Sequence, residues 1–277
     1  MKRPDVFDYL DHHSFLKDWI VFLKESKKMT LRAVANNSGI SVASLSLCLS
    51  KERNWTIKML GKLIPHLELK KLEQDALRQL FILGTTEDPM ERLSSFDELR
   101  RIPGYSEKQR DSSTVYLYLR HWLNVAIREL AQLQDFQANA AWIREKLRFM
   151  PSEVEVERAL KFLIKEGYIK SDDKGKWFTP NKDLDCQEGV FRISLGEFHR
   201  QILQLSQRSI EEIPRELRLI LGHTAVLAEG QKMKAEEILK NALNEIKKLS
   251  SEQTNPDSLY QFELVMIPLS QKKGEAA

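Results

Sequence analysis

The chain has 277 residues and a net charge of +3, and 42% of its residues are hydrophobic and 30% charged. This length allows about two domains with proper cores, and the composition excludes a low-hydrophobicity disordered chain. The 11 glycines and 9 prolines are few, which disfavours a turn-rich β-sandwich and favours a mainly helical protein, α+β overall.

The cysteine count and the lack of long apolar runs indicate where in the cell the protein is located. Cys48 and Cys186 lie far apart in the sequence, so a disulfide framework is excluded and a four-ligand zinc site is disfavoured. No apolar run reaches the ~18 residues that cross a bilayer, and the N-terminus lacks the apolar stretch of a signal peptide. We therefore expect a cytoplasmic protein without membrane contact.

Positive charge is concentrated near the N-terminus. Residues 1–80 hold fourteen Lys and Arg against nine Asp and Glu. An excess of this kind points weakly to a polyanionic partner. A difference of this size is also ordinary in proteins without such a partner.

In the first half of the chain, the spacing of apolar residues predicts helices over 14–26, 31–37, 41–50, 56–67, 70–83 and 87–101. We expect Pro65 to end or kink the fourth helix, and Gly84 to end the fifth. Pro103-Gly104 is expected to end the sixth helix, and the polar stretch 106–113 is expected to follow it as a linker. The predicted domains are 1–85, a helix and linker at 86–113, and 114–277.

In the second half, helices are predicted over 115–133, 140–147, 152–166, 194–212 and 231–249. A polar loop is expected after Pro180 and a polar tail over 270–277. The segments 168–170 and 176–179 flank a turn with Gly175, which indicates a β-hairpin. Helix, helix and hairpin over 139–179 follow the order of a winged helix. The extended-looking segments 218–228 and 260–269 are expected to form a small sheet.

Residues 30–47 fit a helix-turn-helix. Ala35 is small enough for the close approach of two crossing helices, Gly39 suits a turn that needs positive φ, and Ser41 can cap the second helix. The wedge between the helices would be filled by Val34, Ile40 and Leu45. An ordinary helical hairpin within a core is the alternative.

A helix-turn-helix of this kind presents the start of its second helix to the major groove of DNA, with basic residues on the phosphates behind it. The residues expected at such an interface are Arg32, Ser41, Val42, Ala43, Ser44, Ser46, Lys51, Arg53, Asn54 and Lys58.

Residues 30–69 resemble the helix-turn-helix of phage repressors. The wider pattern includes Phe7-Asp-Tyr-Leu-Asp, Tyr118-Leu-Arg-His-Trp, Leu163-Ile-Lys-Glu-Gly-Tyr-Ile-Lys and Tyr260-Gln-Phe. It resembles a bacterial family of uncharacterised paralogous proteins known from Fibrobacter and Bdellovibrio, which join an N-terminal helix-turn-helix to a C-terminal domain of unknown function. The resemblance implies a DNA-binding regulator, and implies no reaction or ligand.

The sequence departs from the repressor pattern at its reading positions. Leu31 and Val42 stand where repressors often place glutamine, and neither can bond an adenine. Glu52 adds a carboxylate between Lys51 and Arg53. Weak, shape-driven or lost DNA binding would each be consistent with these changes.

The predicted winged helix is acidic at the parts that would contact DNA. Glu153, Glu155 and Glu157 lie at the start of its second helix, and Asp172-Asp173 at the hairpin tip. These carboxylates would repel phosphates, although acidic first turns are common because they complement the helix dipole. We expect this part to be structural or to bind protein.

The remaining motifs do not indicate an enzyme. The sequence has no nucleotide-binding glycine motif and no HExxH motif. The pair His12-His13 looks exposed but lacks partners at metal-ligand spacing, and His121 and His199 fit packed or surface positions. We expect no cofactor or metal. The sequence favours a non-catalytic, homodimeric transcription regulator that binds double-stranded DNA, with a protein partner possible for the C-terminal domain; the alternative is an interaction adaptor that keeps the fold without DNA binding.

Overall fold

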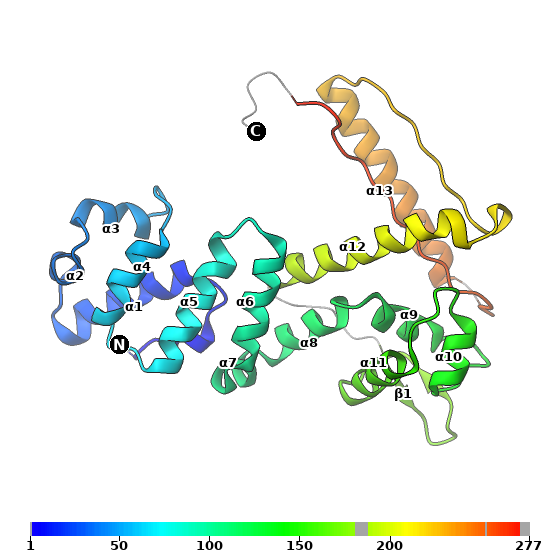
Figure 1. The fold of residues 1–277 in the computed structure, drawn as a ribbon, viewed down its shortest axis with the longest axis horizontal. Coiled ribbons are helices and arrows are strands. Elements are labelled where there is room, and N and C mark those ends of the chain that lie inside the picture. The colour runs from blue at the N-terminus through cyan, green and yellow to red at the C-terminus, as the bar shows by residue number, and fades with distance from the viewer. Residues whose placement is uncertain (1, 181–187, 253, 272–277) are drawn as a thin grey trace. The chain divides into compact units, whose positions relative to one another are not determined.

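The computed structural model describes residues 2–180, 188–252 and 254–271, with only the backbone of 112 and 188–193. Over these residues the chain is mainly helical with one two-stranded sheet (Figure 1), as the composition predicts. The chain divides into two compact units. Residues up to 120, with the start of α12 up to 197, form the first unit, and 121–180 with 198–271 form the second. Cys186, the middle of the loop predicted after Pro180, and most of the predicted tail lie outside the described residues.

The first unit is a series of helices with short connections. In chain order these are η1 (Val6–Asp8), α1 (His12–Lys27), α2 (Leu31–Ser38), α3 (Val42–Leu49), α4 (Ile57–Leu63), η2 (Ile64–His66), α5 (Lys71–Thr85), α6 (Pro89–Arg101), α7 (Pro103–Lys108) and α8 (Arg110–Leu119). The side chains of Asp11, Thr30, Ser41 and Thr56 each accept a bond from a backbone N–H in the helix that follows. These caps satisfy donors that a helix start leaves free.

The apolar faces of these helices share a core that includes the fully buried Phe15 and Trp19 of α1. Phe96 of α6 and Tyr105 of α7 are equally buried in the same core. The helix predicted over 87–101 is confirmed as α6, whereas the stretch 106–113 that was expected to be a linker is mostly helix, in α7 and α8.

The residues predicted to end helices have different outcomes. Gly84 lies inside α5, where an added Cβ would come within 2.9 Å of His12 Nδ1, so the glycine makes room for that ring. The break expected at Pro103 is confirmed, because α6 ends at Arg101 and a new helix, α7, begins at Pro103. Proline suits a first helical position, whose N–H has no intrahelical partner. The expectation for Pro65 is confirmed, because α4 ends at Leu63 and a 3-10 turn follows.

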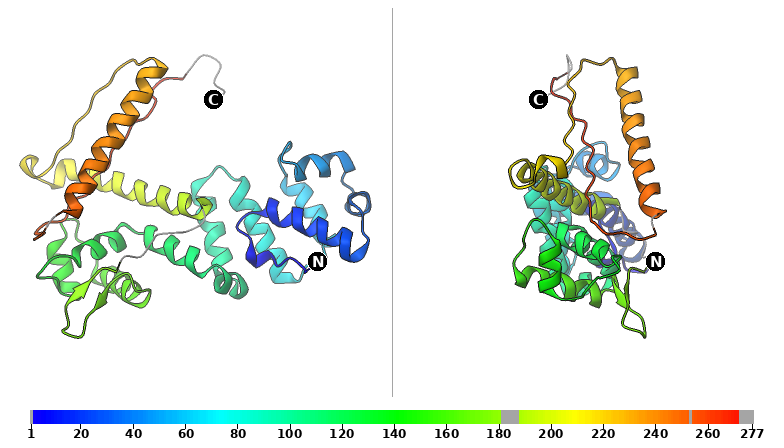
Figure 2. Two further views of the ribbon diagram at one scale, coloured as in Figure 1. Left: turned by 180° about the vertical axis from the view of Figure 1, so that it is seen from behind. Right: turned by 90° about the vertical axis from the view of Figure 1, so that its right-hand side faces the viewer.

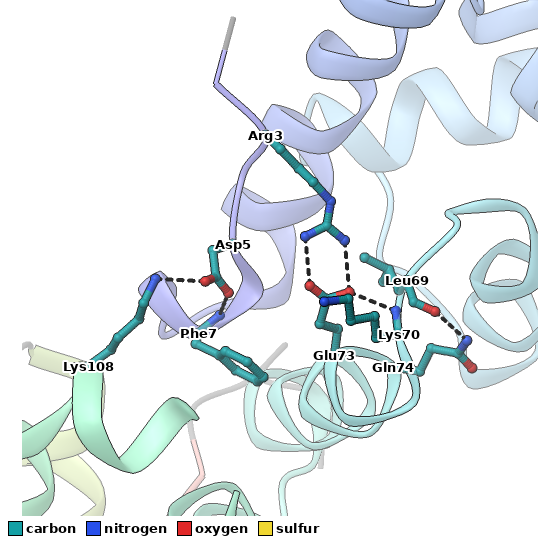
Figure 3. A network of polar contacts seen from close by, with 8 residues as sticks. All are labelled: Arg3, Asp5, Phe7, Leu69, Lys70, Glu73, Gln74 and Lys108. Atoms are coloured by element: carbon teal, nitrogen blue, oxygen red, sulfur yellow. Dashed lines mark hydrogen bonds and ion pairs between the residues drawn. The ribbon is translucent and has the colours of Figure 1, made fainter. Parts of the chain in front are cut away.

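The first residues of the chain are held by a polar network (Figure 3). Both guanidinium Nη atoms of Arg3 donate to the two carboxylate oxygens of Glu73, at 2.7 and 2.8 Å. The same guanidinium lies 4.8 Å from the ring centroid of Trp19. Asp5 accepts a bond from Lys108 Nζ at 2.7 Å. The N-terminal segment is thus tied to both α5 and α7.

The second unit begins with α9 (Trp122–Leu130), α10 (Ala140–Lys146) and α11 (Glu153–Lys165), and α11 packs against the other two. The predicted hairpin is confirmed as β1 (Lys170–Ser171) and β2 (Trp177–Phe178), antiparallel with Lys170 opposite Phe178. Gly167 after α11 and Gly175 in the hairpin turn both have positive φ, which glycine adopts without a Cβ penalty.

The helix predicted over 115–133 is in fact two helices, α8 and α9. His121 has an extended backbone, and its Nδ1 accepts the Leu123 N–H at 3.3 Å, so it caps α9 instead of continuing α8. The apolar stripe expected along one helix is buried on both sides of this break, with Tyr116 and Ile127 fully covered. The division between the two units falls at the same place.

The C-terminal part contains α12 (Glu188–Glu212), η3 (Arg215–Leu217) and α13 (Glu229–Ser251). The small sheet expected from 218–228 and 260–269 does not form over the described residues: both segments are extended but pair with no neighbouring strand. Alternating apolar residues favour extended backbone, but a strand also needs a partner for its N–H and C=O groups.

Candidate nucleic-acid interface

The helix pair α2–α3 has the local geometry that its sequence predicts. Gly39 has φ of 61°, and the N–H of Ile40 donates to the Ala35 carbonyl at 3.0 Å, which closes α2 through a left-handed residue. Ala35 is fully buried, as its place at the approach of two helices requires. The predicted wedge residues are also buried: Val34, Ile40 and Leu45.

α3 separates a buried side from an exposed one. Leu45 and Cys48 are buried, and burial raises the pKa of the Cys48 thiol, so this cysteine behaves as a small apolar residue. The exposed side carries the expected groove-facing residues Ser41, Val42, Ala43 and Ser46, while Ser44 is half-buried. The side chain of Ser41 caps the helix by accepting the Ser44 N–H at 3.1 Å.

Positive charge gathers where the α2–α3 turn faces α4. A shallow hollow there is lined by Gly39, Ile40, Ser44, Arg53, Thr56, Lys58, Met59 and Lys62. We call Arg53, Lys58 and Lys62 the cation cluster. Arg53 Nη1 donates to the hydroxyl of Ser44 at 3.0 Å, and Lys62 Nζ donates to the carbonyl of Gly39 at 3.3 Å. Two side chains of the cluster are thereby held close to the start of α3.

The structure brings together some of the expected residues and leaves others apart from the hollow. Ser44, Arg53 and Lys58 line it, whereas Arg32 and Lys51 are exposed without lining it. Lys51 has a φ of 65°, so the backbone reverses directly after α3. Asn54 is exposed, and its carbonyl lies 3.7 Å from the Cys48 thiol.

Lys62 is a cation that the sequence analysis did not select. It lies four residues after Lys58 on α4, and side chains at that spacing share one face of a helix. This spacing was the signal available in the sequence. Its contact with Gly39, 23 residues earlier, depends on how α4 packs against α2.

Two of the acidic residues, Glu155 of α11 and Asp172 of the hairpin, have structural partners. Ser152 donates through its N–H and its hydroxyl to Glu155 Oε2, at 2.8 and 2.6 Å, and these bonds lower the pKa of Glu155. Asp172 Oδ1 accepts the N–H groups of Lys174 and Lys176 at 2.9 and 2.8 Å. Glu155 therefore caps a helix and Asp172 builds the hairpin turn.

The expectation that His12 is exposed is wrong. Its ring is 7% exposed and packs edge-on against Phe81, and desolvation lowers its pKa. His13 lies with Nε2 at 3.0 Å from the Leu49 carbonyl. Over the described residues no three His, Cys, Asp or Glu side chains gather as metal ligands, and none of the described helices could cross a membrane.

Comparison with protein families gives one match. Residues 104–269 match the model of a domain of unknown function, DUF4423, and the chain belongs to this family. The match runs from α7 into the extended segment after α13, so it leaves out α2, α3 and the cation cluster. No curated protein matches the chain, and no solved structure matches it either.

Proposed function

We propose that the protein is a non-catalytic transcriptional regulator that binds double-stranded DNA. In this proposal α2 and α3 form a helix-turn-helix, and α3 enters the major groove. The observation that carries it is the cation cluster beside an uncharged, exposed start of α3. A helix end without carboxylates, flanked by cations, suits a groove bordered by phosphates.

In this proposal one set of residues contacts the bases and another contacts the phosphates. Ser41, Val42, Ala43 and Ser46 are small, so α3 can approach the bases closely, with the hydroxyls as hydrogen-bonding groups. Arg53, Lys58 and Lys62 hold the phosphates on one side of the groove, assisted by Arg32, Lys51 and Asn54. Such contacts fix the position of the helix and carry little sequence information.

The second unit has a different role in this proposal. Its α10, α11 and hairpin follow the order of a winged helix, but Glu153 and Glu157 at the start of α11 would repel DNA. We assign this unit to contacts between proteins. The resemblance of the sequence to the Fibrobacter and Bdellovibrio family supports a regulator that acts on DNA in the bacterial cytoplasm, as a homodimer on paired half-sites.

The test is binding of the full chain to labelled duplex DNA of random sequence, followed by fluorescence anisotropy over a series of salt concentrations. We expect the logarithm of the affinity to fall linearly with the logarithm of salt concentration. Arg53→Glu should weaken binding about tenfold or more and reduce the slope by about one contact. Lys161→Glu reverses the same charge on α11 and should leave binding unchanged. Equal affinities for the parent and the Arg53 variant at low salt would refute the assignment.

The second candidate is an interaction adaptor that keeps the fold without binding DNA. The observation that favours it is the exposed face of α3, where Val42 and Ala43 offer no hydrogen bond to a base. In the same experiment an adaptor would give no salt-dependent binding at all.

A further inference from the structure

The part of the chain from 218 to 269, which we call the C-terminal arm, is an incomplete fold on its own. It has an extended segment, then α13, then a second extended segment (Figures 1 and 2). None of the residues of α13 is buried. Its apolar stripe is only partly covered: Leu239 and Leu243 are half-buried, and Ile238 is 67% exposed. A helix with one apolar face gains most of its stability from packing that face, and this packing is incomplete within one copy.

The two extended segments also lack strand partners among the described residues. No backbone–backbone hydrogen bond joins residues 219–227 or 256–268 to another described residue. Their apolar side chains are open to solvent, with Leu219 81%, Leu221 82% and Val226 102% exposed. Unpaired strands with exposed apolar side chains are templates for pairing with another chain.

We propose that the C-terminal arm is a dimerisation module, in which the extended segments and α13 of one copy pair with those of a second copy. This inference rests on the homodimer of the proposed function and assigns it to particular residues. Its test measures molecular mass and amide exchange, so its failure can be told apart from a failure of DNA binding. Pairing between copies gives each extended segment a neighbour and covers α13, and a two-fold arrangement does so for both copies at once.

The exposed apolar surface is large enough for a stable dimer. The large apolar side chains exposed in the arm are Leu219, Ile220, Leu221, Val226, Leu227, Met233, Ile238, Leu249, Leu259, Tyr260, Phe262, Leu264, Val265, Met266, Ile267 and Leu269. Each fully exposed side chain of this kind presents about 60–120 Å² of apolar surface. Because most are about half exposed, together they offer on the order of 1,000 Å² per copy, above the ~800 Å² that each partner buries in a stable complex.

The charge pattern favours a second copy over a charged partner. Residues 219–227 contain no Asp, Glu, Lys or Arg. In 258–269 the one charged side chain is Glu263, which pairs with His199 at 2.7 Å. On α13, Lys232 and Lys240 both pair with Glu236, so its charges are mixed and balance one another. Such a surface offers nothing to a nucleic acid or a strongly charged peptide, and it complements itself.

The experiment measures the mass of the full chain in solution by size-exclusion chromatography with light scattering, from low to high micromolar concentration. We expect twice the 32.3 kDa of the chain. The double variant Leu219→Asp, Leu221→Asp should raise the dissociation constant of the dimer at least a hundredfold. Both residues are more than 80% exposed, so the fold of one copy does not depend on them. Met150→Asp with Val154→Asp is the matched control, since these side chains are 74% and 64% exposed outside the arm.

Amide hydrogen exchange provides the second measurement. In the dimer, the amides of 219–227 and 256–268 should be protected, and in the Asp double variant they should exchange as in an unpaired chain. A parent that stays monomeric at all concentrations overturns the proposal. So does a double variant that remains dimeric, or a dimer in which these amides exchange at the unpaired rate.

Discussion

At the residue scale, Gly39 carries the turn between α2 and α3 through its φ of 61°. An added Cβ at this position would meet nothing within 4 Å, so the cost of a larger residue is conformational and not steric. Because β-branched residues resist positive φ, we predict that Gly39→Val lowers the free energy of unfolding by about 1–2 kcal/mol. Thermal unfolding followed by circular dichroism measures the loss.

Gly61 provides the matched control for this prediction. It lies inside α4, its φ is not positive, and a Cβ there also meets nothing within 4 Å. Gly61→Ala should therefore stabilise the protein, by about 0.5–1 kcal/mol, because alanine favours helix. A Gly39→Val variant that melts like the parent would contradict the account of the turn.

A second residue-scale prediction concerns Glu73, whose pKa is lowered chiefly by its bond from Arg3. A carboxyl whose pKa is lower in the folded state stabilises the fold above its ordinary value of 4.5, and this contribution disappears as pH falls through the folded pKa. We predict that Glu73→Gln lowers the free energy of unfolding by about 1–2 kcal/mol at pH 7, a modest value because the Arg3 side chain is 40% exposed. Urea unfolding at a series of pH values should show the difference shrinking in acid.

The comparison variant is Asp75→Asn, which removes the exposed pair between Lys71 and Asp75 at 2.9 Å on α5. Such a surface pair contributes about 0.3–0.5 kcal/mol, so its loss should change little at any pH. If the difference in unfolding free energy between the parent and Glu73→Gln stays constant down to pH 2, the carboxylate charge is not the source of the stabilisation.

At the element scale, α3 and α11 differ in charge: the start of α3 is uncharged, and the start of α11 carries Glu153, Glu155 and Glu157. In the proposed function α11 does not enter the groove, so we predict that Glu153→Gln with Glu157→Gln changes the affinity for duplex DNA less than twofold. Glu155 is left in place since it caps the helix. Anisotropy at low salt is the measurement. A tenfold gain in affinity would identify α11 as a reader held back by its carboxylates.

Most helices could be predicted from the sequence because their causes are local. The apolar spacing and the caps Thr30, Ser41 and Ser152 lie within a few residues of the helix starts that they define. The break at His121 could not be predicted, since the apolar stripe continues across it and only the capping geometry reveals it. The role of Gly84 was equally hidden, because it depends on His12 more than seventy residues earlier.

The candidate site also has some features that the sequence predicts and others that depend on packing. The turn at Gly39 and the exposed face of α3 follow from neighbouring residues, so the sequence was sufficient for them. The approach of Lys62 to Gly39 depends on the packing of α4, which periodicity does not encode. The extended backbone of 218–228 and 260–269 could likewise be predicted from apolar alternation, but the alternation does not specify which strand pairs with them.

At the scale of the whole molecule, pairing through the C-terminal arm would make stability depend on concentration. If two copies fold as one dimer, a tenfold rise in protein concentration should raise the melting temperature by about 2 °C. The Leu219→Asp, Leu221→Asp variant should melt at a temperature independent of concentration. Differential scanning calorimetry at several concentrations makes the comparison, and a constant melting temperature for the parent would contradict dimerisation through the arm.

The N-terminal network in Figure 3 has a consequence for how the protein is made. Arg3 bonds a residue 70 positions later, and Asp5 and Phe7 bond Lys108 and Gln109, 103 and 102 positions later. Synthesis adds about 5–20 residues per second, so these first residues are made several seconds before their partners exist. The first unit can close completely only after α7 has been made, and until then the apolar face of α1 lacks part of the core that covers it.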